Sequence, residues 1–235
     1  MSQKRASNFK KKGSSGWNPA EIFAAWQYEN NVLDSVGSNH GTLTDGTYED
    51  AIVGKGINLG NSTASKITVG NGLNFGDGVS DKSVSISSWI KRTDASGNLA
   101  VLIKRTNNAD KCWNFMTSGA TLYWSFYDSA GRAKEVKHPI TFVVGQWYHV
   151  VGTYDELTDI MKIYVDKVCV GVYSTTAGYT TMRVNTAPVK ISALVTSTWS
   201  GHLALDETFV FNKALSQAEI NFIYDEQLAG NNILT

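Results

Sequence analysis

The sequence is poor in cysteine and proline and has no long apolar run. These absences exclude several classes of protein. Its two cysteines, Cys112 and Cys169, are too few to staple a small secreted domain and too far apart for a zinc site. We expect both to be buried free thiols. No stretch approaches the roughly 18 apolar residues of a membrane span, and the N-terminal region lacks an apolar run of signal-peptide length. The chain as written is therefore expected to be made in the cytoplasm, to be soluble and to bind no membrane.

Net charge is absent as well, but the two signs are unevenly placed. Lysine plus arginine and aspartate plus glutamate both number 21. The basic residues that precede the first acidic one are Lys4, Arg5, Lys10, Lys11 and Lys12. We predict a basic N-terminal arm over residues 1–20 and a single domain over residues 21–235, because the arm has little to bury. The arm is either an electrostatic docking segment for an acidic surface or a solubilising leader.

Short runs rich in β-branched and aromatic residues fill the chain from Ala24 onward. The run "KSVSISSWIKR" alternates strictly, and one of its faces carries Val84, Ile86, Ser88 and Ile90. Comparable runs are "NLAVLIKR", "KCWNFMTS", "TLYWSFYD", "QWYHVVGTYD", "DIMKIYVDK", "VCVGVYST", "APVKISALV" and "LALDETFVF". Many short strands bounded by polar turns predict an all-β sandwich or jelly roll.

One helical pattern follows the last of these runs. Ser216 and Glu219 have the spacing of a capping box, which starts a helix, and Glu219 is therefore assigned a structural role. The residues expected to press this helix onto the sandwich are Ile220, Ile223, Tyr224 and Leu228. In the preceding run Asp206 and Glu207 are neighbours, so a regular strand would point them to opposite faces and prevent them from flanking one substrate bond.

Four segments, in order, resemble the laminin-G-like domains of the concanavalin A-like lectin/glucanase superfamily. They are "NNVLDSVGSNHGTLTDGTYEDAIVGKGINLG", "KSVSISSWIKR", "GQWYHVVGTYDE" with "KIYVDKVCVG", and "GHLALDETFVFNKALSQAEINFIYDEQ". The resemblance implies a concanavalin A-like jelly-roll β-sandwich with a short C-terminal helix. The hairpin reads Val165-Asp166-Lys167, where the family commonly has glycine last. That departure leaves the turn type open, because lysine is less suited than glycine to a positive φ.

The superfamily contains both lectins and glycosidases, so the resemblance alone leaves the activity open. Its glucanases carry alternating acids on one strand, and this chain has no such run. There is no nucleophile elbow and no glycine-rich phosphate loop, and the four histidines lack metal spacing. His149 shares a strand face with Trp147 and Val151, which favours a core histidine over a general base. We predict that the protein is not an enzyme.

Two ligand sites are nevertheless expected. Because related domains hold calcium through loop oxygens, we predict a Ca2+ site formed by Asn30, Asp34, Asn39 and Asp206. The alternative is that Asp34 and Asn39 only make turns. In "TLYWSFYD" the face of Leu122, Trp124 and Phe126 is expected to lie in the core. On the other face, Tyr123 and Tyr127 are the candidate carbohydrate contacts, although strands favour tyrosine without any ligand.

Two functions of different class follow from these observations. The first is a non-enzymatic structural or binding protein of a virion, such as a phage capsid decoration or tail-associated protein. It would display the jelly roll and dock partly through the basic arm on capsid or tail proteins or on copies of itself. Release by host lysis fits the missing leader. The alternative is a carbohydrate-binding lectin module for adhesion at a host or extracellular surface. The acidic balance of the body argues against nucleic acid as a partner.

Overall fold

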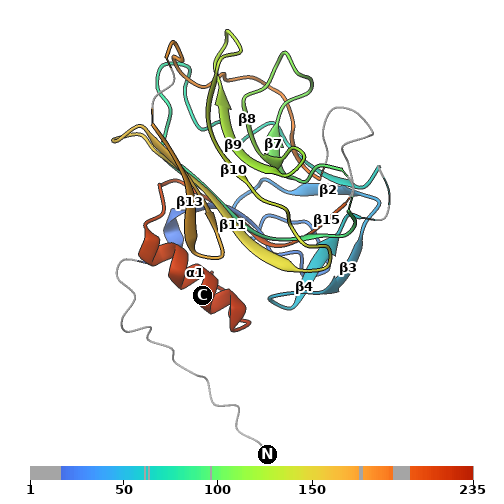
Figure 1. Ribbon diagram of the computed structural model, residues 1–235. Helices are drawn as coiled ribbons and strands as arrows, with labels where there is room; N and C mark the ends of the chain where they lie inside the picture. The colour runs from blue at the N-terminus through green and yellow to red at the C-terminus, as the bar shows by residue number, and fades with distance from the viewer. Residues whose placement is uncertain are drawn as a thin grey trace, which may run out of the picture.

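Two antiparallel sheets pack face to face, and one helix covers the outside of one of them (Figure 1). The computed structural model describes residues 17–60, 62, 64–95, 97–174, 177–192 and 202–234. Sheet A consists of β1 (Ile22–Trp26), β3 (Thr47–Asp50), β4 (Lys55–Asn58), β6 (Val84–Arg92), β11 (Trp147–Asp155), β12 (Ile160–Val165), β13 (Val168–Ser174) and β15 (Leu203–Phe211). Sheet B consists of β2 (Gly41–Thr44), β5 (Lys66–Val69), β7 (Ala100–Lys104), β8 (Trp113–Thr117), β9 (Thr121–Tyr127), β10 (Ala133–Pro139) and β14 (Val189–Ile191).

The strand order joins segments that are distant in the sequence. Sheet A runs β13-β12-β11-β6-β15-β4-β3, with β1 paired to β15, and sheet B runs β10-β9-β8-β7-β14-β5-β2. The last strand of the chain thus lies in the middle of sheet A, between β6 and β4. This arrangement confirms the predicted jelly-roll sandwich. Within the described residues, no helix is long and apolar enough to cross a membrane.

The main core lies between the two sheets and follows the predicted alternation. Val84, Ile86 and Ile90 of β6 face Leu122, Trp124 and Phe126 of β9 across this core, and all six side chains are buried. The aromatic rings meet edge to face, as in the pair Trp124–Phe126, whose centroids are 4.9 Å apart. The period-2 pattern therefore identified the inward faces of both strands correctly.

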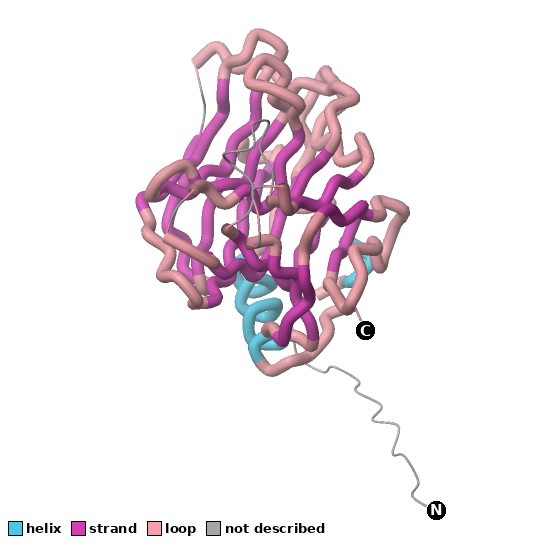
Figure 2. The backbone as a smooth tube through the Cα atoms, turned by 90° about the vertical axis from the view of Figure 1, so that its right-hand side faces the viewer, coloured by secondary structure: helices cyan, strands magenta, loops and turns pink. Residues whose placement is uncertain are grey.

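Helix α1 (Gln217–Leu228) forms a second core on the outer face of sheet A. Figure 2 shows the helix against one side of the strands, while many of the loops gather at the other end of the sandwich. The capping box is confirmed, because the Ser216 hydroxyl accepts from the Glu219 amide and the Glu219 carboxylate accepts from the Ser216 amide. Ile220 and Ile223 are buried as predicted, and Tyr224 is half-buried.

Leu228 was expected to press onto the sandwich and does not, since it is 56% exposed. Its neighbour Gln227 is fully buried in its place. The amide of Gln227 is held by polar partners in sheet A, and this turns Leu228 toward solvent.

The β12–β13 hairpin settles the turn type that the sequence left open. Asp166 and Lys167 have φ values of 45° and 72°, so the two-residue loop is of the I′ kind even without glycine. The prediction that both cysteines are buried free thiols is only partly correct. Both thiols are free, but only Cys112 is buried, whereas Cys169 is exposed because β13 is an edge strand.

Candidate functional site

The acidic pair of β15 lies at a β-bulge, which the sequence did not reveal. Asp206 is opposite Trp89 of β6, and Phe209 is opposite Ser87, so one residue of β6 faces two of β15. Glu207 adopts a left-handed φ of 49° at this point. The extra residue disrupts the alternation on which the sequence prediction depended.

The bulge brings both carboxylates to the helix side of sheet A. Trp89, opposite Asp206, donates its indole Nε1 hydrogen to Oε1 of Gln227, and Nε2 of the same glutamine donates to Glu207. The predicted placement of Asp206 and Glu207 on opposite faces is therefore wrong. A regular strand would separate the two side chains, but the bulge turns the second one back to the face of the first.

Burial governs the chemistry of the pair. Both residues have no exposed surface. Burial raises the pKa of Asp206 to about 7, and burial together with the charge of Asp206 raises that of Glu207 to about 8. Asp206 accepts a hydrogen bond from the Val53 amide, and Glu207 accepts from the side chain of Gln27. Glu207 ties the sheet to the helix through Gln227. Because neither carboxylate reaches solvent, the pair is closed to a substrate in this conformation.

A serine–histidine contact lies under the same helix. Nε2 of His149 is 2.7 Å from the Ser87 hydroxyl, and its ring packs on Trp89 with centroids 5.2 Å apart. Burial lowers the pKa of His149 to about 3, so the ring stays neutral at physiological pH. The prediction of a core histidine is confirmed, since His149 has no exposed surface.

Asp34, one of the four predicted calcium ligands, is occupied by N–H donors. Its Oδ1 atom accepts from the amides of Ala25, Val36 and Gly37, and its Oδ2 atom accepts from the amide and the side chain of Asn39. Burial opposes the charged form, but these hydrogen bonds lower the pKa of Asp34. The contacts match the turn-forming alternative.

Asn39 belongs to this hydrogen-bonded turn, whereas no described hydrogen bond joins Asn30 or Asp206 to it. Asn30 is an exposed residue with a φ of 58°, and Oδ1 of Asp206 is buried without a partner. Among the residues that the structure describes, no three His, Cys, Asp or Glu side chains gather as a metal site. Calcium binding by Asn30, Asp34, Asn39 and Asp206 stays a prediction.

The two candidate sugar-binding tyrosines lie on the outer face of sheet B, as the alternation predicts. Tyr123 is half-buried and packs against a small cluster of Ala100, Ile103 and Met116. The Tyr127 hydroxyl accepts from the side chain of Asn114 at 3.3 Å, and Lys111 lies 4.3 Å from the centre of its ring. Tyr123 thus presents an aromatic surface beside polar groups, whereas one face of the Tyr127 ring already carries a cation.

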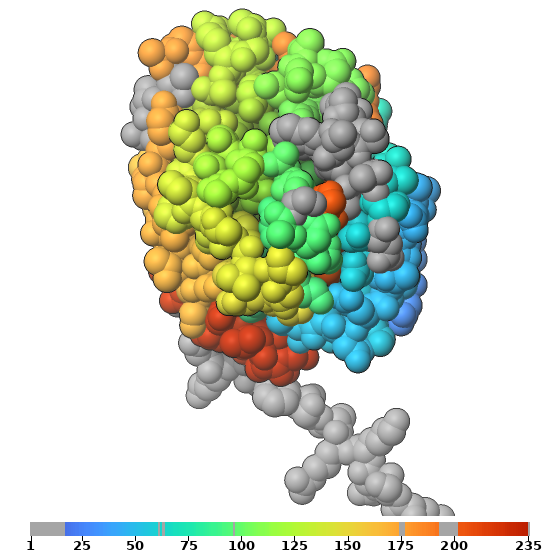
Figure 3. Space-filling model, turned by 45° about the vertical axis from the view of Figure 1, so that its right-hand side comes forward, coloured from blue at the N-terminus to red at the C-terminus, as the bar shows by residue number. Residues whose placement is uncertain are grey.

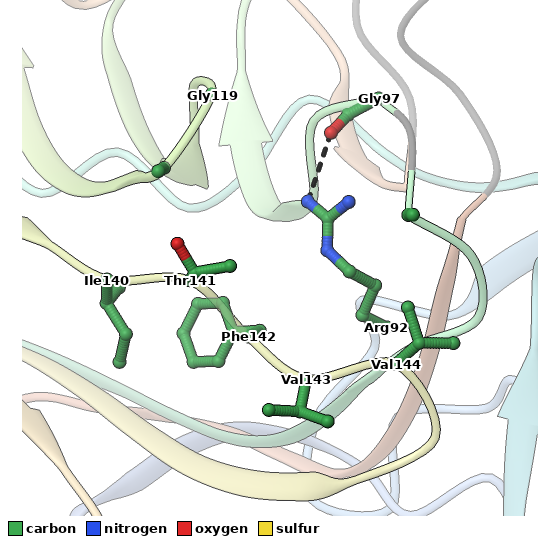
Figure 4. Close-up of a pocket in the computed structure, with 10 residues that line it drawn as sticks. Arg92, Gly97, Gly119, Ile140, Thr141, Phe142, Val143 and Val144 are labelled. Atoms are coloured by element: carbon green, nitrogen blue, oxygen red, sulfur yellow. Dashed lines mark hydrogen bonds between the residues drawn. The ribbon is translucent and has the colours of Figure 1, made fainter.

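A pocket between three loops was not predicted from the sequence. Its volume is about 490 Å³. It is lined by Arg92, Ala95, Gly97, Gly119, Ala120, Ile140, Thr141, Phe142, Val143 and Val144. Figure 4 shows the Arg92 side chain reaching the Gly97 carbonyl, with Ile140 and Phe142 on the facing loop. Three loops that are distant in the sequence form this pocket, so no local sequence motif predicts it.

The pocket is apolar on one side and basic on the other. Both terminal nitrogens of Arg92 donate to backbone carbonyls, those of Asp94 at 3.3 Å and Gly97 at 3.1 Å. Val143 and Val144 are exposed at the rim. On the face shown in Figure 3, the green and yellow surfaces that include these loops adjoin each other, with red helix α1 below them. The predicted docking residues Lys4, Arg5, Lys10, Lys11 and Lys12 lie outside the described residues.

Comparison with known proteins identifies the superfamily. A laminin G family model described as "Concanavalin A-like lectin/glucanases superfamily" matches residues 59–221, which confirms the resemblance. A search of curated proteins found no match.

Solved structures with the same fold include binding domains of toxins. The binding domain of Paraclostridial Mosquitocidal Protein 1 is 17% identical with a TM-score of 0.71, over 88% of this chain and 52% of that one. The receptor-binding domain of botulinum neurotoxin D is 17% identical with a TM-score of 0.69, over 89% and 53% of the two chains. The botulinum neurotoxin type G receptor-binding domain is 17% identical with a TM-score of 0.65, over 88% and 51%. This chain spans about half the length of these domains.

Proposed function

The chain belongs to the concanavalin A-like lectin/glucanases superfamily, and from that premise we propose that it is a non-enzymatic carbohydrate-binding domain. One observation carries the proposal. Strand pairing on the outer face of sheet B sets Tyr123 opposite Met116, next to the pair of Asn114 and Ser125. Asn114 and Ser125 are buried, whereas Lys137 of β10 is exposed opposite Tyr123. An aromatic ring bordered by polar groups suits a sugar, which has an apolar ring face and a rim of hydroxyl groups.

The toxin domains support a binding role only by analogy of fold. Their titles describe binding or receptor-binding domains, and the likeness extends over most of this chain. The carboxylate pair of β15 does not compete with this proposal, because Asp206 and Glu207 are sealed beneath helix α1. The proposed function therefore concerns the outer face of sheet B.

A glycan array with purified full-length protein tests the proposal. We expect the parent protein to bind a subset of glycans and the Tyr123→Ala variant to lose that binding at an unchanged unfolding temperature. Tyr48→Ala is the matched control, since Tyr48 is a partly buried tyrosine on edge strand β3 of the other sheet. Binding that survives Tyr123→Ala, or a parent protein that binds no glycan, would contradict the proposal.

A second proposal concerns the setting in which this domain works. We propose that it is displayed on a virion, as a capsid decoration or tail-associated protein, and docked partly by Lys4, Arg5, Lys10, Lys11 and Lys12. The support is the contrast between five basic residues at the start and 16 basic against 21 acidic residues in the rest of the chain. Removing residues 1–16 should abolish co-sedimentation with purified particles while the fold persists. Unchanged co-sedimentation would disprove docking by the arm.

A further inference from the structure

Positive charge gathers at one end of the outer face of sheet B. Lys190 of β14 lies opposite Ile103 of β7, and Ile103 lies opposite Asn114 of β8, so one row of side chains crosses three strands. Arg105 is two residues beyond Ile103, which places it on the same face. Lys111 joins the group from the loop before β8 through its contact with the Tyr127 ring. We call Arg105, Lys111, Asn114, Tyr127 and Lys190 the basic cluster.

The charges in this cluster are close enough to repel one another. Burial, and then the charge of Arg105, lower the pKa of Lys111. Burial, and then the charge of Lys66, lower the pKa of Lys190, and Arg105 adds to the effect. Asp110 opposes the shift at Lys190, and Glu135 opposes the shift at Lys111, but neither acid cancels it. An anion placed among these groups would relieve the repulsion and gain charge-assisted hydrogen bonds.

Arg105 is the buried cation of the cluster. Its side chain is on a residue only 7% exposed, and Nε is buried without a hydrogen-bond partner. Asp110, the nearby acid, accepts from the amides of Thr106 and Asn107. Within the described part of the chain, no carboxylate forms an ion pair with Arg105. A buried N–H donor without an acceptor is unfavourable unless a ligand or water supplies one.

Asn114, on the adjacent strand, has a buried acceptor that lacks a donor. It is 2% exposed, and its Nδ2 atom donates to the Tyr127 hydroxyl. Its Oδ1 atom is buried and accepts nothing. Ser125 cannot satisfy it from the next strand, since its hydroxyl donates to Glu135 at 2.7 Å. A donor without an acceptor and an acceptor without a donor thus share one face of adjacent strands.

We propose that the basic cluster opens to bind an acidic glycan, whose carboxylate or sulfate group passes between the half-buried Lys111 and Lys190 to Arg105, and one of whose hydroxyl groups then donates to Asn114. Lys111 and Lys190 add positive charge around the anion, and Tyr123 packs against the sugar ring. This inference rests on the proposed carbohydrate-binding function and adds the chemical class of the ligand. It also explains why a cation already lies over Tyr127, since the stacking surface is then Tyr123 and the Tyr127 end of the face serves the anion.

The test begins with an array in which each neutral oligosaccharide has counterparts that carry a sialic or uronic acid and counterparts that carry a sulfate ester. The best soluble hit is then titrated into the parent and its variants by calorimetry at two salt concentrations. We expect acidic glycans to bind at least tenfold more tightly than their neutral counterparts, and less tightly as salt rises. The two acidic arms show whether carboxylate or sulfate is preferred.

Three variants localise the anion. Arg105→Gln should weaken binding about tenfold or more, as expected for loss of a charge-assisted hydrogen bond. It should leave the unfolding temperature unchanged or raise it, because an unpaired buried charge is removed. Lys190→Gln should weaken binding about threefold. If Arg105→Gln fails to fold, Lys190→Gln tests the anion site in its place. Lys162→Gln, on β12 of sheet A, makes the same change of charge as Lys190→Gln and should alter affinity less than twofold.

The outcomes separate this inference from the function on which it rests. Equal binding of neutral and acidic glycans, with loss in Tyr123→Ala and no loss in Arg105→Gln or Lys190→Gln, would overturn the basic cluster and keep the carbohydrate-binding function. Absence of all glycan binding would overturn both. Loss of acidic glycan binding in Arg105→Gln together with Tyr123→Ala, but not in Lys162→Gln, would support both.

Discussion

The indole Nε1 of Trp89 donates to Oε1 of Gln227 at 2.9 Å, and this bond ties the middle of sheet A to the C-terminal helix. Nε2 of the same glutamine donates to Glu207 at 3.2 Å. One buried side chain thus satisfies both a tryptophan and an acidic residue. The helix is held by this polar contact as well as by its apolar residues.

Gln227→Leu should therefore destabilise the protein although it makes the buried face more apolar. The Trp89 donor and the Glu207 acceptor would lose their partner, and each unsatisfied buried group costs about 1–3 kcal/mol. We expect a loss of about 2–4 kcal/mol in the free energy of unfolding, measured with urea. Leu228→Gln is the control, because Leu228 is exposed and should change stability by less than about 0.5 kcal/mol. Equal effects of the two substitutions would contradict this role.

Glu207 should make stability fall as the pH rises toward 8. Its native pKa of about 8 lies above the ordinary value of 4.5, so the native state binds more protons than the unfolded state between these values. The stabilisation is complete below the unfolded pKa and is lost as pH rises through the native pKa. Relative to Glu207→Gln, the parent should lose up to about 1.4 kcal/mol per pH unit between pH 5 and 8.

The comparison with Glu207→Gln is needed because other groups titrate in the same range. His149 has a lowered pKa and opposes the trend below about pH 6.5, whereas Asp206 has a raised pKa and reinforces it. Both remain in the two proteins, so the difference in unfolding free energy isolates Glu207 and its coupling to Asp206. A difference that is constant from pH 5 to 8 would show that Glu207 is ionised in the native state at every pH in this range.

Asp34→Ala should lower stability, because five N–H groups lose their acceptor. We expect a loss of about 2 kcal/mol or more, as for loss of a strong cap or buried hydrogen bonds. Asp77→Ala is the matched control, since Asp77 accepts from two amides in an exposed turn, and its loss should be much smaller. A loss as small as that of Asp77→Ala would contradict the structural role of Asp34.

The same pair of proteins tests the calcium prediction. If Asp34 is a ligand, CaCl2 should raise the unfolding temperature of the parent above its value in EDTA, and Asp34→Ala should abolish that difference. Identical unfolding temperatures of the parent in CaCl2 and EDTA would disprove calcium binding at these residues. Calorimetric titration with CaCl2 gives an independent measurement.

Lys167 offers a test of the strained hairpin. Its φ of 72° suits glycine, but its side chain also pairs with Asp225 at 2.9 Å. Lys167→Gly and Lys167→Ala both remove that ion pair, so their difference reports the backbone alone. We expect the glycine variant to be about 1 kcal/mol more stable than the alanine variant. An alanine variant of equal or greater stability would show that the turn relaxes.

Features that depend on local chemistry could be predicted from the sequence. The capping box of Ser216 and Glu219 and the alternation of β6 each involve residues close in the chain, so their patterns are visible without a fold. The bulge at Asp206 depends on which residues of β6 stand opposite β15, and this pairing joins distant segments. The burial of Gln227 in place of Leu228 depends on the same sheet, because only Trp89 and Glu207 favour a polar residue there.

The candidate site also combines residues that a local pattern predicts with residues that only the strand order brings together. The alternation in β9 placed Tyr123 and Tyr127 on the outer face. The partners that give this face its character, Arg105 and Lys190, come from β14 and the end of β7, and the order of strands in sheet B brings them together. The unsatisfied Nε of Arg105 is a property of packing, which a sequence does not express.

The most direct test of carbohydrate binding on sheet B is an NMR titration of 15N-labelled protein with the best oligosaccharide from the array. We expect the largest chemical-shift changes at the Asn114 side-chain amide and at the backbone amides of β8 and β9 around Tyr123. Changes concentrated instead at Gly97 and Ile140–Val144 would place the ligand in the pocket beside Arg92 and contradict carbohydrate binding on sheet B.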